Sequence, residues 1–450
     1  MGTTIAAIST PSGEGGIGIV RISGEDARSI ADRVFRSVSG KKIADAKGYT
    51  ALFGKVYDGQ SALDEAVALI FAAPKSYTGE DVVELSVHGG SAATRLLLRA
   101  VLEAGAVPAG AGEFTRRAFQ NGKMNLAEAE SVMSIISAQG SQDLRLALAA
   151  KTGRISSEIA AIRERLLAVD ASMAVFADYP DEDLPELSLD YIKENLLSVR
   201  DALEALLKNY DTGKILREGL SAAIVGAPNV GKSTLMNLLS GDERSIVTPV
   251  AGTTRDVIEE SVRIGDITLR LADTAGIHDT ADTVEEIGVE RSRRRAKSAE
   301  LLLAVFDSSR PLSHDDREIL SLIGDTPAIA IINKTDLPSM LCDADITIPK
   351  VYISAKEGRL DELSAAIAEA CKLANLGADR AVLQSERQRA CAHRARESVL
   401  EALASMDAGW TLDAVGICAD EALEALLELT GERVTNAVAD EVFSRFCVGK

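Results

Sequence analysis

The chain has 450 residues, enough for two to four domains, and 46% of them are hydrophobic, which allows extensive cores. The formal net charge of −19 argues against a protein whose whole surface wraps nucleic acid, although a local basic patch stays compatible with it. The five cysteines contain no C-x-x-C pair, so no disulfide framework is expected. No segment has the form of a signal peptide or the length of a membrane span, which predicts a cytoplasmic protein with no membrane partner.

The N-terminal part alternates strand-like and helix-like segments too irregularly for a doubly wound sheet and predicts a compact α+β unit. Gly13, Gly15 and Gly18 form a G-x-G-x-x-G pattern. β-branched residues follow it where a dinucleotide site needs a helix, so a strand connection is favoured over a Rossmann site. The predicted elements are a helix over 25–38, strands near 50–57, 66–72 and 82–87, and a helix over 92–104.

Two stretches of this part are polar and glycine-bearing within ordered surroundings, residues 76–84 and 112–123. Their composition is compatible with ordinary loop and cap chemistry and equally with a binding site. Composition alone leaves both interpretations open.

The character of the sequence becomes helical at Asn125, where Asn125 and Glu128 fit a capping box. Helical periodicity continues to about Val175, and the two prolines of the segment 178–185 interrupt it. Further helices are predicted near 188–212, 384–407 and 419–428. Since each has an apolar face to bury, the helices on both sides of the central region are expected to pack into one bundle.

The central region begins with a phosphate-binding loop, Gly226-Ala-Pro-Asn-Val-Gly-Lys-Ser-Thr234, of the form G-x-x-x-x-G-K-[ST]. A buried strand is predicted before it and a helix after it, which is the context that the motif requires. Glycines let the backbone amides turn toward phosphate oxygens, Lys232 brings a positive charge to them, and the Ser233 hydroxyl can ligate Mg²⁺.

Three more segments follow in the order and at the intervals of guanine-nucleotide-binding proteins. A threonine of the segment 245–256 can reach Mg²⁺, and Asp273 and Gly276 end a strand where they can meet the Mg²⁺ shell and the γ-phosphate. Buried parallel strands are predicted at 301–307 and 328–332, and the second leads to Asp336, whose carboxylate can accept hydrogen bonds from N1 and N2 of guanine. The residues predicted to bind GTP are Asn229, Val230, Gly231, Lys232, Ser233, Thr234, Thr248, Pro249, Val250, Ala251, Gly252, Thr253, Thr254, Asp273, Thr274, Ala275, Gly276, Asn333, Lys334, Asp336, Ser354, Ala355 and Lys356.

Other features of this region keep two interpretations. The basic run from Arg291 to Lys297 fits a solvated helix face or a surface that docks a partner or RNA. Glu285 fits a surface glutamate or a residue that orients water, and His278 fits an exposed loop histidine or a polar partner near the γ-phosphate.

Several motifs together resemble the MnmE (TrmE) family of tRNA-modification GTPases over the whole chain. They are residues 13–24, 76–81, 88–90, 112–115, 121–123 and the C-terminal Cys447-Val-Gly-Lys450. The resemblance implies a multidomain α+β and α/β chain with three parts: an N-terminal tetrahydrofolate-binding and dimerisation domain at 1–118, a discontinuous helical domain at 119–216 and 377–450, and a Ras-like P-loop G domain at 217–376.

The resemblance also implies roles for individual residues. Arg21, Glu84, Lys123 and Lys450 match folate-binding positions, Ser233 and Thr254 match Mg²⁺ ligands, and Asn229, Thr248, Val250 and Thr253 match K⁺ ligands. Glu285 matches the catalytic glutamate that positions water, and Cys447 matches a cysteine needed for the modification.

The family's activity, carried over, is a K⁺-stimulated, dimerisation-dependent hydrolysis of GTP. The homodimer acts in a heterotetramer with MnmG, a flavoprotein that uses FAD and NADH. Together they add an aminomethyl or carboxymethylaminomethyl group at C5 of the wobble uridine of certain tRNAs, with a 5-formyl or methylene tetrahydrofolate derivative as the one-carbon source.

The main alternative function is a regulatory or ribosome-assembly GTPase switch. The folate-type loops and the C-terminal Cys-Val-Gly-Lys argue against it, because such a switch does not need them. A purely structural helical scaffold leaves four ordered guanine-nucleotide motifs unexplained.

Overall fold

The computed structural model describes residues 2–178, 189–241, 260–271, 299–324, 326–356, 358, 360–371 and 380–450. The chain divides into two compact units. Unit 1 comprises Met1–Met133, Ser156–Val199 and Ser385–Lys450, and unit 2 comprises Ser134–Ile155 and Arg200–Gln384. Among the helices of the described ranges, none is both long and apolar enough to cross a membrane.

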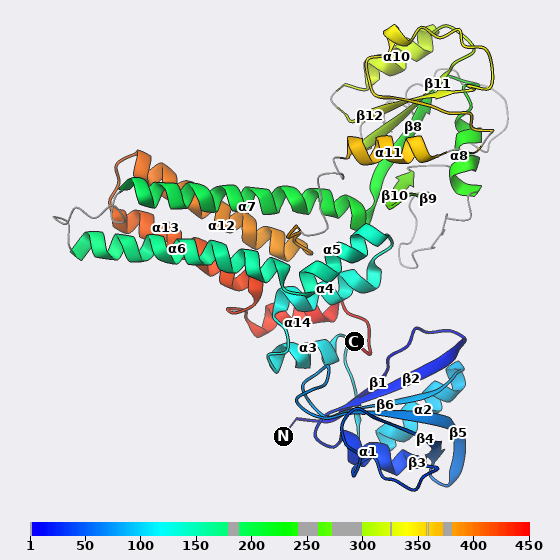
Figure 1. Cartoon of the computed structure of the whole chain (residues 1–450), viewed down its shortest axis with the longest axis vertical. Helices are drawn as coiled ribbons and strands as arrows, with labels where there is room; N and C mark the ends of the chain where they lie inside the picture. Colours follow the sequence, from blue (N-terminus) through cyan, green and yellow to red (C-terminus); the bar gives the residue numbers. More distant parts are fainter. Residues whose placement is uncertain are drawn as a thin grey trace. The chain divides into compact units, whose positions relative to one another are not determined.

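Unit 1 contains a seven-stranded sheet (Figure 1). Its strand order is β3-β4-β5-β6-β2-β1-β7, and all pairs are antiparallel except β1 with β7. The strands are β1 (Ile5–Ile8), β2 (Gly15–Ser23), β3 (Phe35–Ser37), β4 (Thr50–Asp58), β5 (Ser61–Phe71), β6 (Val82–Gly89) and β7 (Val107–Pro108). The glycine-rich run thus enters a strand, as predicted, and does not start a helix.

Two helices, α1 (Ala27–Val34) and α2 (Ser91–Glu103), pack on this sheet. Ile30 and Leu97 share a buried cluster with Val20 of β2. The prediction of one helix over 25–38 is wrong at its C-terminal end, because the chain leaves the helix at Val34 and forms β3. There Phe35 is buried and pairs with Val56 of β4, so tertiary pairing overrides the local helical pattern.

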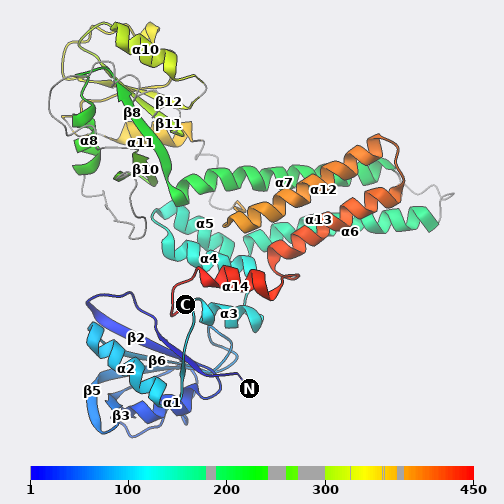
Figure 2. The same ribbon diagram turned by 180° about the vertical axis from the view of Figure 1, so that it is seen from behind.

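The remaining helices of unit 1 come from both sides of the central region. They are α3 (Glu113–Gln120), α4 (Leu126–Ser137), α6 (Arg154–Asp178), α7 (Leu189–Glu218), α12 (Glu386–Asp407), α13 (Leu412–Thr430) and α14 (Asn436–Ser444), of which α4, α6 and α7 continue into unit 2. Figures 1 and 2 both show α6 and α13 side by side. The predicted bundle is therefore confirmed, although α13 begins seven residues before the predicted helix at 419.

The predicted capping box at the start of α4 is present. The Glu128 amide donates to Oδ1 of Asn125 at 2.9 Å, and the Asn125 amide donates to Oε2 of Glu128 at 3.1 Å. At the other end of the chain, Phe443 of α14 packs in one buried cluster with Leu126 and Val132 of α4. A helix that precedes the central region is thus joined to the last helix of the chain.

A largely buried ion pair joins parts of this bundle that are far apart in the sequence. Both guanidinium ends of Arg387, at the start of α12, bond the carboxylate of Glu130 in α4, at 3.0 and 2.8 Å. Ser385 and Gln388 donate to the same carboxylate, and Arg387 also donates to the carbonyls of Glu428 and Leu429 near the end of α13. Because each charge has several partners, the cost of burying the pair is offset.

Unit 2 contains a six-stranded sheet of order β13-β12-β11-β8-β10-β9, parallel except for β9 with β10. Its strands are β8 (Leu220–Gly226), β9 (Glu260–Ile264), β10 (Ile267–Leu271), β11 (Leu301–Asp307), β12 (Ala328–Asn333) and β13 (Lys350–Tyr352). All residues of β11 and β12 are buried, which confirms the predicted buried parallel strands.

Helices cover both faces of this sheet. Alternate residues of β11 enter two different cores, Leu303 with α8 (Lys232–Gly241) and α11 (Asp361–Ala370), and Phe306 with α10 (His314–Leu322). The core with α8 also contains Leu146 of α5 (Ser141–Lys151) and Leu216 of α7. A short 3₁₀ helix, Asp343–Asp345, completes the described elements. The multidomain α+β and α/β class with a Ras-like sheet is confirmed.

The carboxyl group of Asp170 lies where its charged form is disfavoured. Burial, together with the negative charge of Asp420 in α13, raises the pKa of Asp170 in α6 to about 6. The folded chain therefore binds this proton more tightly than the unfolded chain does. Unit 1 loses stability as the pH rises through 6 and regains it as the pH falls toward 4.

We predict that Asp170→Asn raises the stability of unit 1 above pH 7. A shift of this size corresponds to about 3 kcal/mol, and solvent screening at a half-exposed carboxyl reduces the expected gain to about 1 kcal/mol. Thermal unfolding at pH 8 and pH 4.5 measures it, and the gain should shrink at the lower pH. Asp420→Asn should shift stability in the same direction, and an equal gain at both pH values would contradict the assignment.

Candidate functional site

The phosphate-binding loop of unit 2 is built between the end of β8 at Gly226 and the start of α8 at Lys232. Asn229 and Gly231 adopt positive φ values of 63° and 98°. A Cβ at Gly231 would lie 2.2 Å from Nδ2 of Asn333, and one at Gly226 would lie 2.7 Å from the Val305 carbonyl oxygen. Both glycines are therefore required for the close turn that gathers backbone amides at the start of α8.

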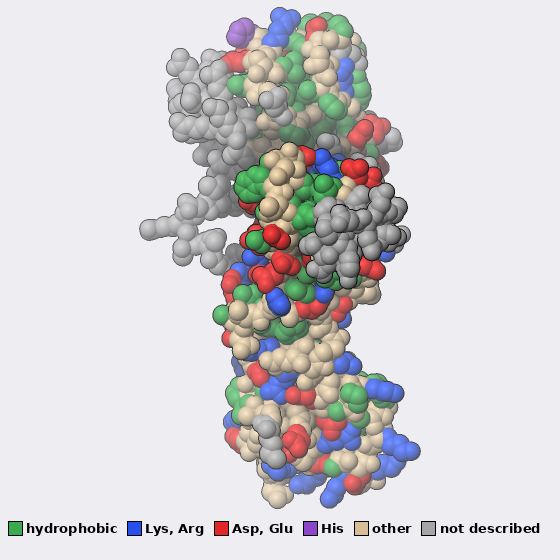
Figure 3. Space-filling view, turned by 90° about the vertical axis from the view of Figure 1, so that its left-hand side faces the viewer, with side chains coloured by type: hydrophobic (Ala, Val, Ile, Leu, Met, Phe, Trp, Pro, Cys, Tyr) green, Lys and Arg blue, Asp and Glu red, His purple; other side chains and the backbone are tan. Residues whose placement is uncertain are grey.

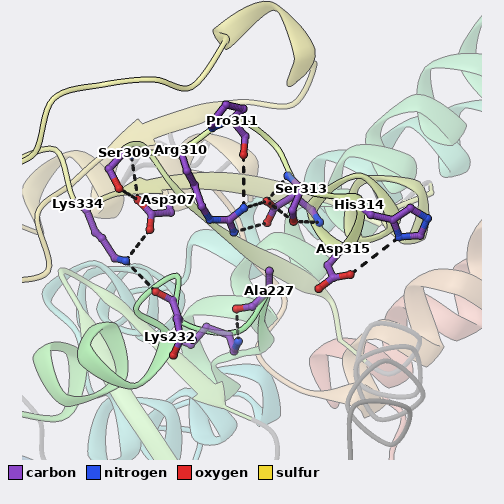
Figure 4. A network of polar contacts seen from close by, with 12 residues as sticks. Ala227, Lys232, Asp307, Ser309, Arg310, Pro311, Ser313, His314, Asp315 and Lys334 are labelled. Atoms are coloured by element: carbon purple, nitrogen blue, oxygen red, sulfur yellow. Dashed lines mark hydrogen bonds and ion pairs between the residues drawn. The ribbon is translucent and has the colours of Figure 1, made fainter.

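Lys232 lies folded over this loop. Its Nζ donates to the carbonyl oxygens of Gly226 at 2.8 Å and Ala227 at 2.7 Å (Figure 4). Its neighbours Ser233 and Thr234 are exposed in the first turn of α8. The loop thus combines a positive charge, a helix N-terminus and exposed hydroxyl groups, a set that suits phosphates and a hard cation.

Asn333 joins the base-recognition segment to the phosphate loop. Its Nδ2 donates to the Val230 carbonyl at 2.9 Å, and its Oδ1 accepts from the Ala355 amide at 3.1 Å. The side chain is buried, so both amide ends are satisfied inside the protein. Nearby, the Ser354 hydroxyl donates to Oδ1 of exposed Asp336 at 3.0 Å and orients that carboxylate, while Lys356 is exposed.

Lys334 makes a second connection to the loop. Its Nζ donates to the Asn229 carbonyl at 2.8 Å and to Oδ2 of Asp307 at 2.6 Å (Figure 4). Burial alone would favour the neutral form of Asp307, but hydrogen bonds from Lys334 and Ser309 outweigh it and hold the pKa of this carboxyl below its usual value. Asp307 therefore stays charged and fixes the ammonium beside the loop.

Several predicted residues lie outside the described residues: 248–254, 273–276, His278, Glu285 and the basic run 291–297. Their assignment to Mg²⁺, K⁺, the γ-phosphate and water stays a prediction.

Unit 1 holds a second polar site on β2 and β6. Arg21 and Glu84 are paired across these strands, and Nε of Arg21 lies 2.8 Å from Oε1 of Glu84. The Arg21 guanidinium lies 5.7 Å from the ring centre of Tyr77 and 5.5 Å from that of Phe114. The predicted folate residues Arg21 and Glu84 are thus in direct contact.

The two polar stretches that composition left open are bound to each other. Arg117 donates to both carboxylate oxygens of Glu80 at 3.1 Å and to Glu113 at 2.9 Å. The Tyr77 and Thr115 hydroxyls are 2.9 Å apart, and burial raises the pKa of the Tyr77 hydroxyl. These contacts hold residues 76–84 and 112–123 as one platform around Arg21.

The other two predicted folate residues touch the same platform. Nζ of Lys123 donates to the Pro74 carbonyl at 3.1 Å, just before the 76–84 stretch. The main-chain oxygen of Lys450 accepts from the Phe114 amide at 3.1 Å. The C-terminal tail, defined as Cys447–Lys450, therefore lies on the N-terminal domain, and the Cys447 side chain is exposed.

Comparison with known proteins identifies the family. The protein-family model of the GTP-binding protein TrmE N-terminus matches residues 4–123, and the family model of the MnmE helical domain matches residues 126–447. The tRNA modification GTPase MnmE of Geobacillus kaustophilus is 42% identical over 460 residues, with 99% of each chain covered. The chain belongs to the MnmE family of tRNA modification GTPases.

Other relatives agree with this assignment. The MnmE protein of Geobacillus thermodenitrificans is 42% identical and that of Alkaliphilus oremlandii is 41% identical, again over 99% of both chains. The predicted family is thus confirmed, together with its class of enzyme, a P-loop GTPase.

Sequence reasoning missed three residues that build these sites in this MnmE family member. The sequence pattern predicts Asp307 only as the end of a buried strand, although a carboxylate there needs a charged partner. Phe114 and Gly449 belong to quoted motifs, but their contacts with Arg21 join segments more than 90 residues apart. No local pattern reports such contacts.

We predict that Asp307→Asn weakens binding of GDP and GTP about tenfold, or about 1.4 kcal/mol. The substitution keeps an acceptor for Ser309 but removes the charge that holds Lys334 against the loop. Fluorescent-nucleotide titration measures the affinity, and Asp315→Asn on the exposed start of α10 is the matched control. Equal affinities for Asp307→Asn and the wild type would show that Asp307 does not position Lys334.

Proposed function

We propose that this chain is the GTP-hydrolysing subunit of a tRNA-modifying complex with the flavoprotein MnmG. Together they install an aminomethyl or carboxymethylaminomethyl group at C5 of the wobble uridine of certain tRNAs. One observation supports this proposal most directly: the same chain contains two kinds of site. One is a guanine-nucleotide loop held by Asn333 and Lys334, and the other is the platform around Arg21, to which the C-terminal tail is bound. A ribosome-assembly switch needs only the first of these.

In the G domain, which we place at residues 217–376, Asp336 accepts the N1 and N2 hydrogens of guanine and Ser354 holds it in position. Lys232 and the loop amides bind the phosphates, and Ser233 with Thr254 binds Mg²⁺. Asn229, Thr248, Val250 and Thr253 hold K⁺, which supplies positive charge near the β- and γ-phosphates when bound. Glu285 positions the attacking water.

The positive φ of Asn229 supports its part in this assignment. Lys334 fixes the Asn229 carbonyl at 2.8 Å, so the backbone is held while the exposed side chain stays free to face the nucleotide. An amide oxygen is a suitable ligand for an alkali cation.

In the N-terminal domain, at residues 1–118, the platform suits a folate. Its glutamate carboxylates match Arg21, Lys123 and Lys450, and its pterin N–H groups match the Glu84 carboxylate. A 5-formyl or methylene form supplies the one-carbon unit, glycine or ammonium the amine, and exposed Cys447 takes part in the chemistry. FAD and NADH belong to MnmG.

The same domain forms the homodimer in this proposal. Phe53 of β4 and Val67 of β5 are 55% and 37% exposed, although their strand neighbours Leu52 and Ala68 are buried under α1 and α2. The open face of the sheet therefore carries apolar side chains that a second copy would cover. The helical domain, at 119–216 and 377–450, carries the inserted G domain.

We place the protein in the cytoplasm. The distribution of charge supports a role in which the N-terminal domain faces the tRNA. Residues 1–118 contain equal numbers of acidic and basic side chains, so the negative excess lies in the rest of the chain. Figure 3 shows basic side chains spread over this domain, whereas acidic ones gather on the helices. A polyanion is repelled least by the N-terminal domain.

The cation assignment predicts that GTP turnover rises at least tenfold when K⁺ replaces Na⁺, and that Asn229→Ala abolishes the rise. The expected cause is loss of a ligand to a cation that stabilises charge near the phosphates. Phosphate release measures turnover, with Asn237→Ala on the exposed side of α8 as control. Equal turnover of the wild type in both salts would remove the K⁺ assignment.

The proposed modification predicts that deletion of the gene abolishes the C5 substituent of the wobble uridine. Nucleoside analysis of total tRNA by mass spectrometry measures it. The wild-type gene and Asn237→Ala should restore the substituent, whereas Asp336→Ala should not, because guanine recognition is lost. Survival of the modification in the deletion strain would favour the switch function instead.

A further inference from the structure

The C-terminal tail is held on the N-terminal domain by its backbone. Val448 forms an antiparallel bridge with Ala111, and the amide of Gly112 donates to the Cys447 carbonyl at 3.4 Å. The Ser9 hydroxyl donates to the Gly449 carbonyl at 3.1 Å, and the Phe114 amide donates to the main-chain oxygen of Lys450. The four residues of the tail are thus anchored through main-chain oxygens and a bridge to two separate segments, residues 111–114 and Ser9.

Arg21 makes the bond that connects this tail to the platform. Its Nη1 donates to the Gly449 carbonyl at 3.2 Å, while its Nε is bound to Glu84. The side chain is only 16% exposed and lies against the rings of Tyr77 and Phe114. Because a guanidinium is planar and its donors point in fixed directions, these contacts leave it one orientation.

Gly449 is the one tail residue that must be glycine for this arrangement. Its φ is 98°, and a Cβ there would lie 2.3 Å from the Ile8 carbonyl oxygen and 3.1 Å from Cα of Ser9. A side chain would have to displace the main chain of β1 or leave the site. The close approach is what brings the Gly449 carbonyl within reach of both Ser9 and Arg21.

We propose that Arg21 and Gly449 form a tail latch, and that Arg21 is a positioning residue that presents exposed Cys447 beside the platform. The role in modification rests on the proposed function. Nε of Arg21 binds Glu84, and Nη1 binds the Gly449 carbonyl. Arg21 therefore holds the tail in addition to any contact that it makes with a bound ligand.

Semisynthesis tests the latch in the full chain. A thioester of residues 1–446 can be ligated to Cys-Val-X-Lys at Cys447, with glycine, L-alanine or D-alanine as X. D-alanine favours positive φ and carries its Cβ on the opposite side of Cα, so it should keep the tail bound where L-alanine releases it. Amide hydrogen exchange of residues 111–114, measured by mass spectrometry, reports release, because the Gly112 and Phe114 amides donate to the tail.

We expect exchange at these amides about tenfold faster for L-alanine than for glycine and near the glycine rate for D-alanine. Arg21→Lys, which keeps the charge but loses the planar donor geometry, should also accelerate exchange. Gly409→Ala is the matched control, because Gly409 has a φ of 72° and open space around its Cβ position. Modification of tRNA with MnmG should fall with L-alanine and recover with D-alanine, with GTP hydrolysis unchanged.

Equal hydrogen exchange in the L-alanine and glycine chains would overturn the latch. Release of the tail without loss of tRNA modification would overturn the positioning role. The proposed function fails separately, if the wild-type chain with MnmG modifies no tRNA or binds no 5-formyltetrahydrofolate. In that case the hydrogen-exchange series still decides whether Arg21 and Gly449 hold the tail.

Discussion

The largely buried ion pair of Glu130 and Arg387 joins the parts of the helical bundle that precede and follow the inserted nucleotide domain in the sequence. It joins α4, before the insertion, to α12, after it, although the two residues are 257 positions apart. Arg387 also satisfies carbonyls near the end of α13, so three helices are fixed by one guanidinium. Loss of either charge would leave the other buried without its partner, which commonly costs about 3–5 kcal/mol.

The same physical device builds both candidate sites. In unit 2 the Asn333 amide and the Lys334 ammonium bind main-chain carbonyls of the phosphate loop. In unit 1 the Arg21 guanidinium binds a main-chain carbonyl of the C-terminal tail. In each case a glycine with positive φ, Gly231 or Gly449, allows the close approach. Side chains from distant strands thus set the backbone of the phosphate loop and of the tail, while Ser233 and Cys447 stay exposed.

Much of this was predictable from sequence. Runs of consecutive apolar residues predicted β11 and β12, and the capping box predicted the start of α4. Motif order predicted a guanine-nucleotide site, and in the described residues the phosphate loop follows β8 and Asn333 ends β12 of the parallel part of the sheet. The predicted end of α1 is wrong, since residues 35–37 pair with β4 and form a strand. Local propensity carries no information about an available strand edge.

The sequence by itself determined the family, the fold class and the chemical inventory of the sites, because these depend on residue types at short, fixed spacings. Only the tertiary structure decided which of these residues meet. Arg21, Phe114 and Gly449 come together because β2 pairs with β6 and the last helix packs on α4. Such contacts follow from the closing of sheets and bundles, and the free energy that selects them comes from burial summed over each whole unit.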